Sequence, residues 1–311
     1  MKLISVVTPC FNEEQNVEIV YQKVKEVFSK LPEYKYEHVF IDNSSSDRTV
    51  EILKSISKTD RNIKIIVNIR NFGHIRSPYY GILQSKGDAV ILLVCDLQDP
   101  PLLIIDFVKK WEEGNKIVIG TKAKSKENKI MFLIRKIFYT LISKISETDQ
   151  IKNFTGFGLY DKGFIDILRT LDEPYPYFRG LITELGYCRI EIPFNQPRRD
   201  KGKTKNNFYT LYDIAMLGFV SYSKLPLRLA SFIGFAVSFL SFLIAMAYFV
   251  AKLVFWNTFT IGIAPLVIGI FFFGGIQLFF LGVIGEYIGA IFTQVKKRPL
   301  VIEKERINFD D

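Results

Sequence analysis

The sequence predicts an α/β domain with a mostly parallel sheet, followed by a two-helix transmembrane hairpin. Up to residue 228, apolar runs of about five to eight residues alternate with charged stretches that favour helices, which is typical of a parallel sheet. Two long segments then follow without any charged side chain, one between Arg228 and Lys252 and one between Lys252 and Glu286. A chain of 311 residues can hold one such domain and an appended hairpin.

Four short buried strands are expected first, and a polar cluster follows each of them. The strands are residues 4–8, 38–41, 63–67 and 89–94. Helices are expected between them, one starting at about Arg48 and an earlier one whose apolar stripe is Val17, Val20, Val24 and Val27. Because ligands bind at the carboxyl ends of the strands of an open parallel sheet, the polar clusters predict the binding site.

The two uncharged segments predict membrane-spanning helices at about residues 229–251 and 263–285. A helix of about 23 residues spans roughly 34 Å, enough for the hydrocarbon core of a bilayer. The basic residues Lys224, Arg228, Lys296, Lys297 and Arg298 flank the hairpin on its outer sides. By the positive-inside rule, we expect a two-span protein of the cell inner (cytoplasmic) membrane with both termini in the cytoplasm. Two buried helices of a soluble core are the alternative.

Charge and cysteine content narrow the classes of partner. A net charge of +9 suits nucleic acid, anionic lipid or phosphorylated substrates, and beside a membrane hairpin the last two are favoured, with no nucleic acid. Cys10, Cys95 and Cys188 have neither metal nor disulfide spacing, which indicates a reduced compartment. The first apolar run is too short for a signal peptide.

The order of the polar motifs is the most specific feature of the chain. The motifs are Asn-Glu-Glu at 12–14, Asp-x-x-x-x-Asp at 42–47, Asn-x-Gly at 71–73, Asp-Leu-Gln-Asp-Pro-Pro at 96–101, Arg-x-x-Gly-x-Thr-Lys at 199–205, Ser-Lys-Leu-Pro-Leu-Arg at 223–228 and Gly-Glu-Tyr-Ile-Gly at 285–289. Nearly the whole chain resembles family 2 glycosyltransferases of the GT-A (Rossmann-like) fold. Within that family it is closer to the branch of dolichyl-phosphate mannose synthase and bactoprenol glucosyltransferase.

The resemblance implies an inverting hexosyltransferase that moves a sugar from a UDP- or GDP-linked donor to undecaprenyl or dolichyl phosphate. The implied role is modification of cell-envelope glycan or lipopolysaccharide, and a homo-oligomer is left open. The implied parts are a cytoplasmic catalytic domain at 1–206, an interfacial amphipathic segment at 207–228, two spans within 229–290 and a cytoplasmic tail at 291–311.

Acidic side chains can accept hydrogen bonds from the N–H groups of a uracil or guanine ring. The resemblance implies that Pro9, Phe11, Glu13 and Asp42 line the pocket for the base. Helix capping is the alternative use of such polar turns, above all for Asp47.

Asp96 and Gln98 are two residues apart after a strand, so both side chains point the same way and can hold Mg²⁺ or Mn²⁺. With Asp99 they form the expected catalytic group, because a departing nucleoside diphosphate needs charge stabilisation. The resembled motif is Asp-x-Asp-x-Gln, but its first position is Val94 here, and Asn43 replaces the second Asp of an earlier turn. The loss of one carboxylate predicts a weakened metal site.

Phosphate binding is implied for a set of residues that match the resembled family: Arg135, Arg199, Thr204 and Lys205. Attraction to anionic lipid is the alternative for such a basic cluster. Bactoprenol glucosyltransferases commonly carry Gly-Asp-Phe-Arg where this chain has Thr155-Gly156-Phe157-Gly158. A polyprenyl phosphate is already an anion and needs positioning more than a base, but the departure leaves another lipid-linked or glycan acceptor open.

Two further functions stay open. A processive polysaccharide synthase would carry a Gln-x-x-Arg-Trp motif and several spans, whereas residues 196–199 are Gln-Pro-Arg-Arg. A catalytically impaired membrane scaffold is the other, and Val94, Asn43 and Gly156 are the residues that favour it.

Overall fold

The computed structural model describes residues 1–123, 151, 153–197, 225–255 and 263–309. An eight-stranded sheet forms its centre, in the order β7-β5-β6-β4-β1-β2-β3-β8. The strands are β1 Leu3–Cys10, β2 Lys35–Asp42, β3 Ile63–Asn68, β4 Ala89–Leu92, β5 Ile117–Lys122, β6 Phe154–Asp161, β7 Arg189–Phe194 and β8 Glu303–Ile307. The helices are α1 Val17–Ser29, α2 Thr49–Thr59, α3 Gly73–Gln84, α4 Leu103–Glu112, α6 Lys162–Thr170, α7 Phe178–Glu184, α9 Leu225–Val254 and α10 Ile263–Val295.

The sheet is mostly parallel, as the sequence predicts. Strands β4, β1, β2 and β3 pair in parallel, and so do β5 and β7. Strand β6 runs antiparallel to both β4 and β5, and β8 runs antiparallel to β3. The carboxyl ends of β1 to β4 therefore meet at one edge of the sheet, where the four expected polar clusters lie.

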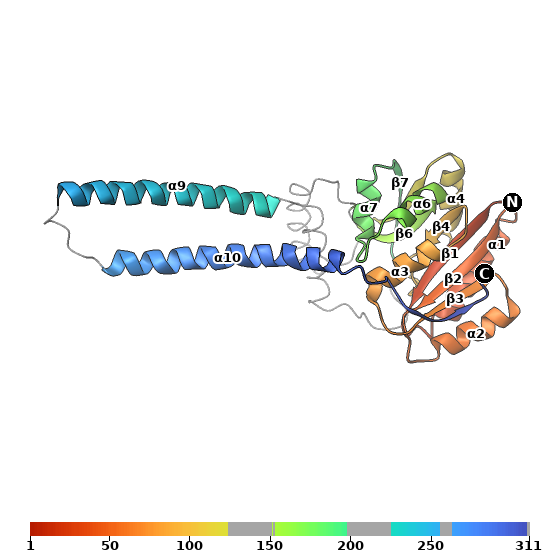
Figure 1. Ribbon diagram of the computed structural model, residues 1–311. Coiled ribbons are helices and arrows are strands. Elements are labelled where there is room, and N and C mark those ends of the chain that lie inside the picture. Colours follow the sequence, from red (N-terminus) through yellow and green to blue (C-terminus); the bar gives the residue numbers. More distant parts are fainter. Residues whose placement is uncertain (124–150, 152, 198–224, 256–262, 310–311) are drawn as a thin grey trace.

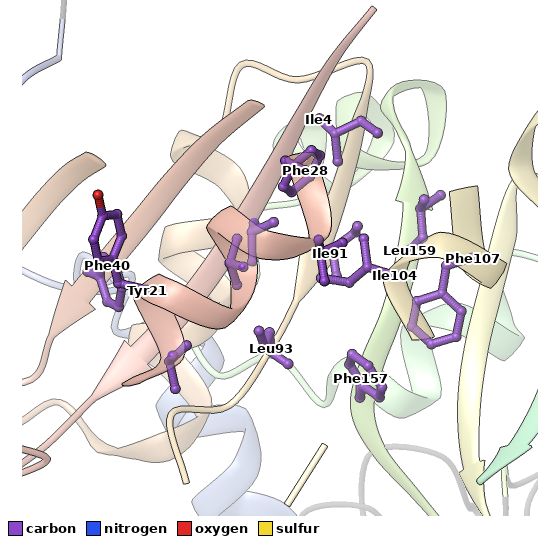
Figure 2. Close-up of a cluster of buried hydrophobic side chains, with 14 of the residues drawn as sticks. Ile4, Tyr21, Phe28, Phe40, Ile91, Leu93, Ile104, Phe107, Phe157 and Leu159 are labelled. Carbon is purple, nitrogen blue, oxygen red and sulfur yellow. The ribbon is translucent and has the colours of Figure 1, made fainter. Parts of the chain in front are cut away.

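Helices cover both faces of the sheet because successive strand residues alternate between two hydrophobic clusters. Val6, Phe40 and Ile91 belong to the cluster under α1, α2 and α4, part of which Figure 2 shows. Their neighbours Val7 and Ile41 belong to the cluster under α3, α6 and α7. The predicted stripe of α1 is confirmed, since Val17, Val20, Val24 and Val27 are each at most 1% exposed.

The last strand corrects the expectation that residues 291–311 are a simple tail. After α10 the chain returns to the sheet, and β8 pairs with β3 in a register that sets Ile307 opposite Ile65. Its sequence, Glu-Lys-Glu-Arg-Ile, lacks apolar alternation because it is an edge strand held by polar contacts. Lys54 pairs with Glu305 at 2.6 Å, and the Tyr80 hydroxyl donates to Glu303 at 2.8 Å.

Helices α9 and α10 extend side by side away from the sheet domain (Figure 1). Each contains a window apolar enough to cross a membrane, with mean hydropathy 2.0 over Leu227–Ile244 and 1.7 over Phe272–Val295, and neither window is buried. Both helices are longer than expected, and α10 runs through Glu286 to Val295. The helix ends where Lys297 adopts a left-handed φ of +43° and Pro299 follows.

Candidate active site

The polar turns after β1 and β2 are joined by hydrogen bonds at the carboxyl edge of the sheet. The backbone N–H of Asn12 donates to Ser45 Oγ at 2.8 Å, and the N–H of Ser46 donates to Asn12 Oδ1 at 2.8 Å. Asn12 has a left-handed φ of +55°, which asparagine tolerates better than most residues. The structure thus brings together the two turns that were expected to bind the base.

The four residues predicted for the base pocket lie at this edge, but they are not equally accessible. Pro9, Phe11 and Glu13 are half-buried, and Asn16 Nδ2 donates to Glu13 Oε2 at 2.6 Å. Asp42, at the end of β2, is completely buried.

Ser45 occupies both carboxylate oxygens of Asp42. Its hydroxyl donates to Oδ1 at 2.5 Å and its backbone N–H donates to Oδ2 at 2.9 Å. Burial raises the pKa of Asp42, although the hydrogen bonds from Ser45 act in the opposite direction. Each oxygen of this buried carboxylate thus already accepts one hydrogen bond from Ser45, and each keeps a second lone pair as an acceptor.

Asp47 caps the start of α2. Its Oδ1 accepts hydrogen bonds from the backbone N–H of Thr49 at 3.0 Å and from the Thr49 hydroxyl. Its Oδ2 accepts from the N–H of Glu14 at 3.2 Å. Helix capping, the alternative weighed for this residue, is what the contacts show.

Asn43 joins the end of β2 to the loop that precedes α3. Its Oδ1 accepts hydrogen bonds from Phe72 N at 2.8 Å and from Asn68 Nδ2 at 3.2 Å. Its Nδ2 donates to Asn71 Oδ1 at 2.9 Å and to the carbonyl of Gly73 at 3.2 Å. An aspartate cannot donate, so the amide at this position has a structural use that a carboxylate would lose.

The loop after β4 carries the expected catalytic group. Asp96 and Gln98 are half-buried, and the backbone N–H of Gln98 donates to Asp96 Oδ1 at 3.1 Å. Asp99 is 1% exposed, and neither of its carboxylate oxygens has a hydrogen-bond partner among the described residues. Burial above all raises the pKa of Asp99 to about 7, with Asp96 adding to the rise and Lys122 opposing it.

Val94 lies on the accessible side of this loop. Strand β4 ends at Leu92, two residues earlier than expected, and the chain continues extended with Leu93 N donating to the carbonyl of Val7 at 2.9 Å. Leu93 and Cys95 are 1% and 3% exposed, whereas Val94 and Asp96 are both half-buried. Val94 and Asp96 are thus both partly accessible, although Cys95 and Asp96 lie in a turn, where the alternation of a strand no longer applies.

The loop after β4 carries oxygen atoms that suit a divalent cation whose remaining ligands come from a bound phosphate-containing substrate. In the part of the chain that the structure describes, no three Asp, Glu, His or Cys side chains form a group able to bind a metal. Asp96, Gln98 and Asp99 supply two carboxylates and an amide oxygen, the hard ligands that Mg²⁺ prefers, and the buried Asp99 carboxylate lacks another partner. Mg²⁺ commonly completes its shell with water and substrate phosphates.

The backbone of β6 explains why the chain lacks the Asp and Arg of the resembled motif. Gly156 has a φ of +103°, where any side chain is strained, and an added Cβ would lie 3.0 Å from Leu92 Cδ2. An added Cβ at Gly158 would lie 2.6 Å from the carbonyl oxygen of Val118. The two glycines are thus required by the strand as it is built.

Two arginines that the sequence analysis did not select lie near this edge. Arg76 is the one Lys or Arg in α3, and its Nε is buried without a hydrogen-bond partner among described residues. Its guanidinium carbon is 5.2 Å from the ring centroid of Tyr175. Arg179, in the first turn of α7, is half-buried. A lone charge in an otherwise uncharged helix is the signal that marks Arg76.

The predicted phosphate-binding residues Arg135, Arg199, Thr204 and Lys205 lie outside the described residues, as does most of the segment 207–228. A cavity of about 580 Å³ opens at the opposite edge of the sheet, beside Lys2, Asp88 and Trp111. None of the predicted site residues lines it. The polar turns and this cavity are therefore separate places in the fold.

Comparison with known proteins agrees with this arrangement. Residues 5–165 match the family model described as glycosyl transferase family 2. The chain is 35% identical to the uncharacterized glycosyltransferase sll0501 of Synechocystis sp., over 96% of this chain and 94% of that protein. It is 33% identical to the SfII prophage-derived bactoprenol glucosyl transferase of Shigella flexneri, over 97% of each chain.

Among solved structures, glucosyl-3-phosphoglycerate synthase from Mycobacterium tuberculosis aligns with a TM-score of 0.51 and 18% identity. The alignment covers 70% of this chain and 78% of that one. It supports the fold of the sheet domain.

Proposed function

The chain belongs to the family 2 glycosyltransferases, and on that premise we propose that it moves a hexose from a UDP- or GDP-linked sugar to a polyprenyl phosphate. The observation that carries the proposal is the full-length similarity to a bactoprenol glucosyl transferase, which takes in both the sheet domain and the hairpin. A likeness confined to the sheet domain would support sugar transfer without pointing to a lipid acceptor.

The turns after β1 and β2 are the proposed site for the nucleotide base. Pro9 and Phe11 supply apolar surface for the ring, and the carboxylates of Glu13 and Asp42 accept hydrogen bonds from its N–H groups. Ser45 holds the Asp42 carboxylate in place through one hydrogen bond to each oxygen, and the remaining lone pairs are the proposed acceptors for the base.

The loop after β4 is the proposed site for the diphosphate. Asp96 and Gln98, with Asp99 beside them, would hold a Mg²⁺ or Mn²⁺ ion that neutralises charge on the leaving nucleoside diphosphate. With Val94 in place of a carboxylate, this site holds the ion less tightly before the donor arrives.

The acceptor needs no general base. A phosphate oxygen of the polyprenyl phosphate attacks the anomeric carbon, and the bond from that carbon to the diphosphate oxygen breaks with its electron pair on the nucleoside diphosphate. Attack opposite to the leaving group inverts the anomeric configuration. The main tasks of the protein are to align the two anions and to offset their repulsion.

The hairpin is proposed to hold this chemistry at the cytoplasmic face of the cell inner membrane. Helices α9 and α10 have the length and composition of spans, and their large apolar side chains are exposed. The basic residues on their outer sides support, by the positive-inside rule, a cytoplasmic sheet domain and cytoplasmic termini.

Transfer to lipid tests the proposal directly. The full chain in detergent micelles is incubated with radiolabelled UDP- and GDP-sugars and undecaprenyl phosphate, and the lipid is extracted. Label in the lipid phase that depends on undecaprenyl phosphate supports the proposal. Label only in a water-soluble glycan would point to another acceptor or to a processive synthase, and no transfer from any donor would favour a membrane scaffold.

A further inference from the structure

We propose that Arg76 and Arg179 bind the phosphate group of the acceptor, in a subsite between α3, α7 and the base of the helical hairpin. The inference rests on the proposed function for the identity of the acceptor as a lipid phosphate. The two arginines would take over the role of the arginine that the resembled motif carries at the position of Gly158.

Among the described residues, neither guanidinium group has an anionic partner. In the described ranges, no carboxylate forms an ion pair with either arginine, whereas Arg169, Arg189 and Arg306 each pair with one. The buried Nε of Arg76 has no acceptor at all there. Leaving a partly buried charged donor unsatisfied costs free energy, which a bound anion would recover.

Aromatic packing brings the two arginines toward the same place. Phe178 of α7 packs against Tyr79 of α3, with ring centroids 6.2 Å apart, and against Tyr160 of β6 at 5.0 Å. Arg179 directly follows Phe178, and Arg76 is three residues before Tyr79 on α3. The first turn of α3 also directs its backbone N–H groups and positive dipole end toward this region.

Electrostatic effects agree with that placement. The pKa of His74, in the first turn of α3, is lowered by partial desolvation and then by the charge of Arg179, although the residue as a whole is exposed. Burial raises the pKa of Tyr160, and the charge of Arg179 opposes that rise. The charge of Arg179 therefore acts on a residue of α3 and on Tyr160, near the end of β6.

Tyr160 connects the region around Arg179 with residues 155–158, where the chain departs from the resembled motif. Its hydroxyl donates to the carbonyl of Gly156 at 2.7 Å. Gly156 and Gly158 cannot present the carboxylate and the guanidinium of the resembled motif, as their backbone shows. Arg76 and Arg179 supply positive charge from the neighbouring helices instead.

The loop between α6 and α7 contacts the C-terminal end of α10, the base of the hairpin. This contact favours a phosphate that is carried by a lipid. In the loop between α6 and α7, Glu173 accepts a hydrogen bond from Gln294 of α10 at 2.9 Å. Asp172 lies 3.3 Å from the Lys297 ammonium, just beyond the end of α10. Tyr175 of that loop stacks on Arg76. A headgroup at the membrane surface beside α10 is thus next to the proposed subsite.

Binding measurements on the full chain in detergent micelles test the subsite. Undecaprenyl phosphate, uncharged undecaprenol, inorganic phosphate and the nucleoside diphosphates are each titrated into wild type, Arg76→Gln, Arg179→Gln and the double variant. Arg61→Gln is the charge-matched control, because Arg61 is exposed and precedes β3 at the opposite edge of the sheet. Thermal unfolding of each variant shows whether the fold is kept.

We expect each single variant to raise the dissociation constant for undecaprenyl phosphate about tenfold, which corresponds to about 1.4 kcal/mol. Binding of undecaprenol and of the nucleotide, and all binding by Arg61→Gln, should stay at the wild-type level. The subsite is refuted if the double variant binds undecaprenyl phosphate as wild type does. It is refuted equally if nucleotide binding weakens in parallel, because the arginines would then hold the donor diphosphate.

The outcome separates this inference from the proposed function. A wild-type chain that binds undecaprenyl phosphate through the two arginines but transfers no sugar to it refutes the function and leaves the subsite standing. Arginine-dependent binding of inorganic phosphate together with no binding of undecaprenyl phosphate refutes the lipid source.

Discussion

The side-chain amide of Asn43 donates a hydrogen bond to Asn71 Oδ1 over 2.9 Å, and so connects the ends of β2 and β3. Asn43→Asp would remove both of its donors and set a carboxylate against Asn71 Oδ1 and the carbonyl of Gly73. We expect the variant to lose about 1–3 kcal/mol of unfolding free energy. Thermal and denaturant unfolding would show this loss, with Asn195→Asp at an exposed position as control. A variant with unchanged stability and tighter metal binding would make Asn43 a weakened metal ligand.

Asp96→Ala should reduce sugar transfer about a hundredfold or more while the protein stays folded, because Asp96 lies on the accessible side of its loop. Asp106→Ala is the matched control, since Asp106 is an exposed carboxylate in the first turn of α4. The measurement is initial rate against Mg²⁺ concentration, together with thermal unfolding. Wild-type turnover in Asp96→Ala would remove Asp96 from the metal site.

His38 predicts an acid-sensitive fold. It is completely buried in β2, where the Thr8 hydroxyl lies 2.9 Å from its Nε2, and burial lowers its pKa from 6.5 to about 3. Between these two values the unfolded chain binds a proton that the folded chain excludes, so stability falls as the pH drops below about 6.5. The loss is about 2 kcal/mol at pH 5, from about 1.4 kcal/mol per pH unit.

The test compares unfolding free energies of wild type and His38→Gln at pH 7.5 and pH 5. The difference between the two proteins should shrink at the lower pH, because glutamine does not titrate. Equal losses in both proteins would show that carboxylates, and not His38, set the acid sensitivity.

The core of the fold could be predicted because its elements carry strong local patterns. The valine stripe of α1 and the apolar runs of β1 to β4 are fixed by burial on one or both faces, and such burial leaves a clear periodicity. Strand β8 has no such pattern, since it borders solvent and is held by its pairing with β3, by the ion pair of Glu305 with Lys54 and by the hydrogen bond of Glu303 with Tyr80. Long-range polar contacts of this kind leave no local signature.

The candidate site was predicted less completely than the fold. Motif order located the turns, but it could not show that Ser45 already satisfies Asp42, or that Asn43 spans two loops through four hydrogen bonds. Arg76 and Arg179 are more than a hundred residues apart in sequence, and tertiary contacts such as the packing of Phe178 on Tyr79 relate them. Which groups remain without a partner depends on tertiary packing, which the sequence does not state.

Strand β8 predicts that the hairpin can be removed but the end of the chain cannot. A protein lacking residues 229–290, with a short linker, should fold and bind nucleotide, because α9 begins and α10 ends at the same end of the hairpin, the one that faces the sheet domain (Figure 1). Further removal of residues 303–311 would expose the edge of β3 and break the pair of Lys54 with Glu305. We expect a lower unfolding temperature and more aggregation in the shorter protein, measured by calorimetry and light scattering. Equal stability would mean that β8 adds nothing to the sheet.

Val94→Asp should restore part of the metal affinity that this chain has lost. Val94 is half-buried, as Asp96 is, so a carboxylate at position 94 would have some access to solvent and would lie two residues from the proposed ligand Asp96. Two effects compete: an added anionic oxygen tightens binding of Mg²⁺, and an unpaired carboxylate in a half-buried place costs stability. Because Val94 is not fully buried, we expect the first effect to win when metal is present and the second to appear as a lower unfolding temperature without it.

The deciding measurement is the Mg²⁺ concentration at half-maximal transfer rate, taken with unfolding temperatures in the presence and absence of Mg²⁺. A lower requirement for Mg²⁺, with Mg²⁺ raising the unfolding temperature more in the variant than in wild type, is the expected result. Val94→Asn is the control for polarity, because asparagine has a shape similar to that of aspartate but carries no charge. If Val94→Asp and Val94→Asn lose stability alike and keep the wild-type requirement for Mg²⁺, the cation does not reach position 94. The ion would then be held by Asp96, Gln98 and the donor diphosphate without any contribution from the first position of the motif.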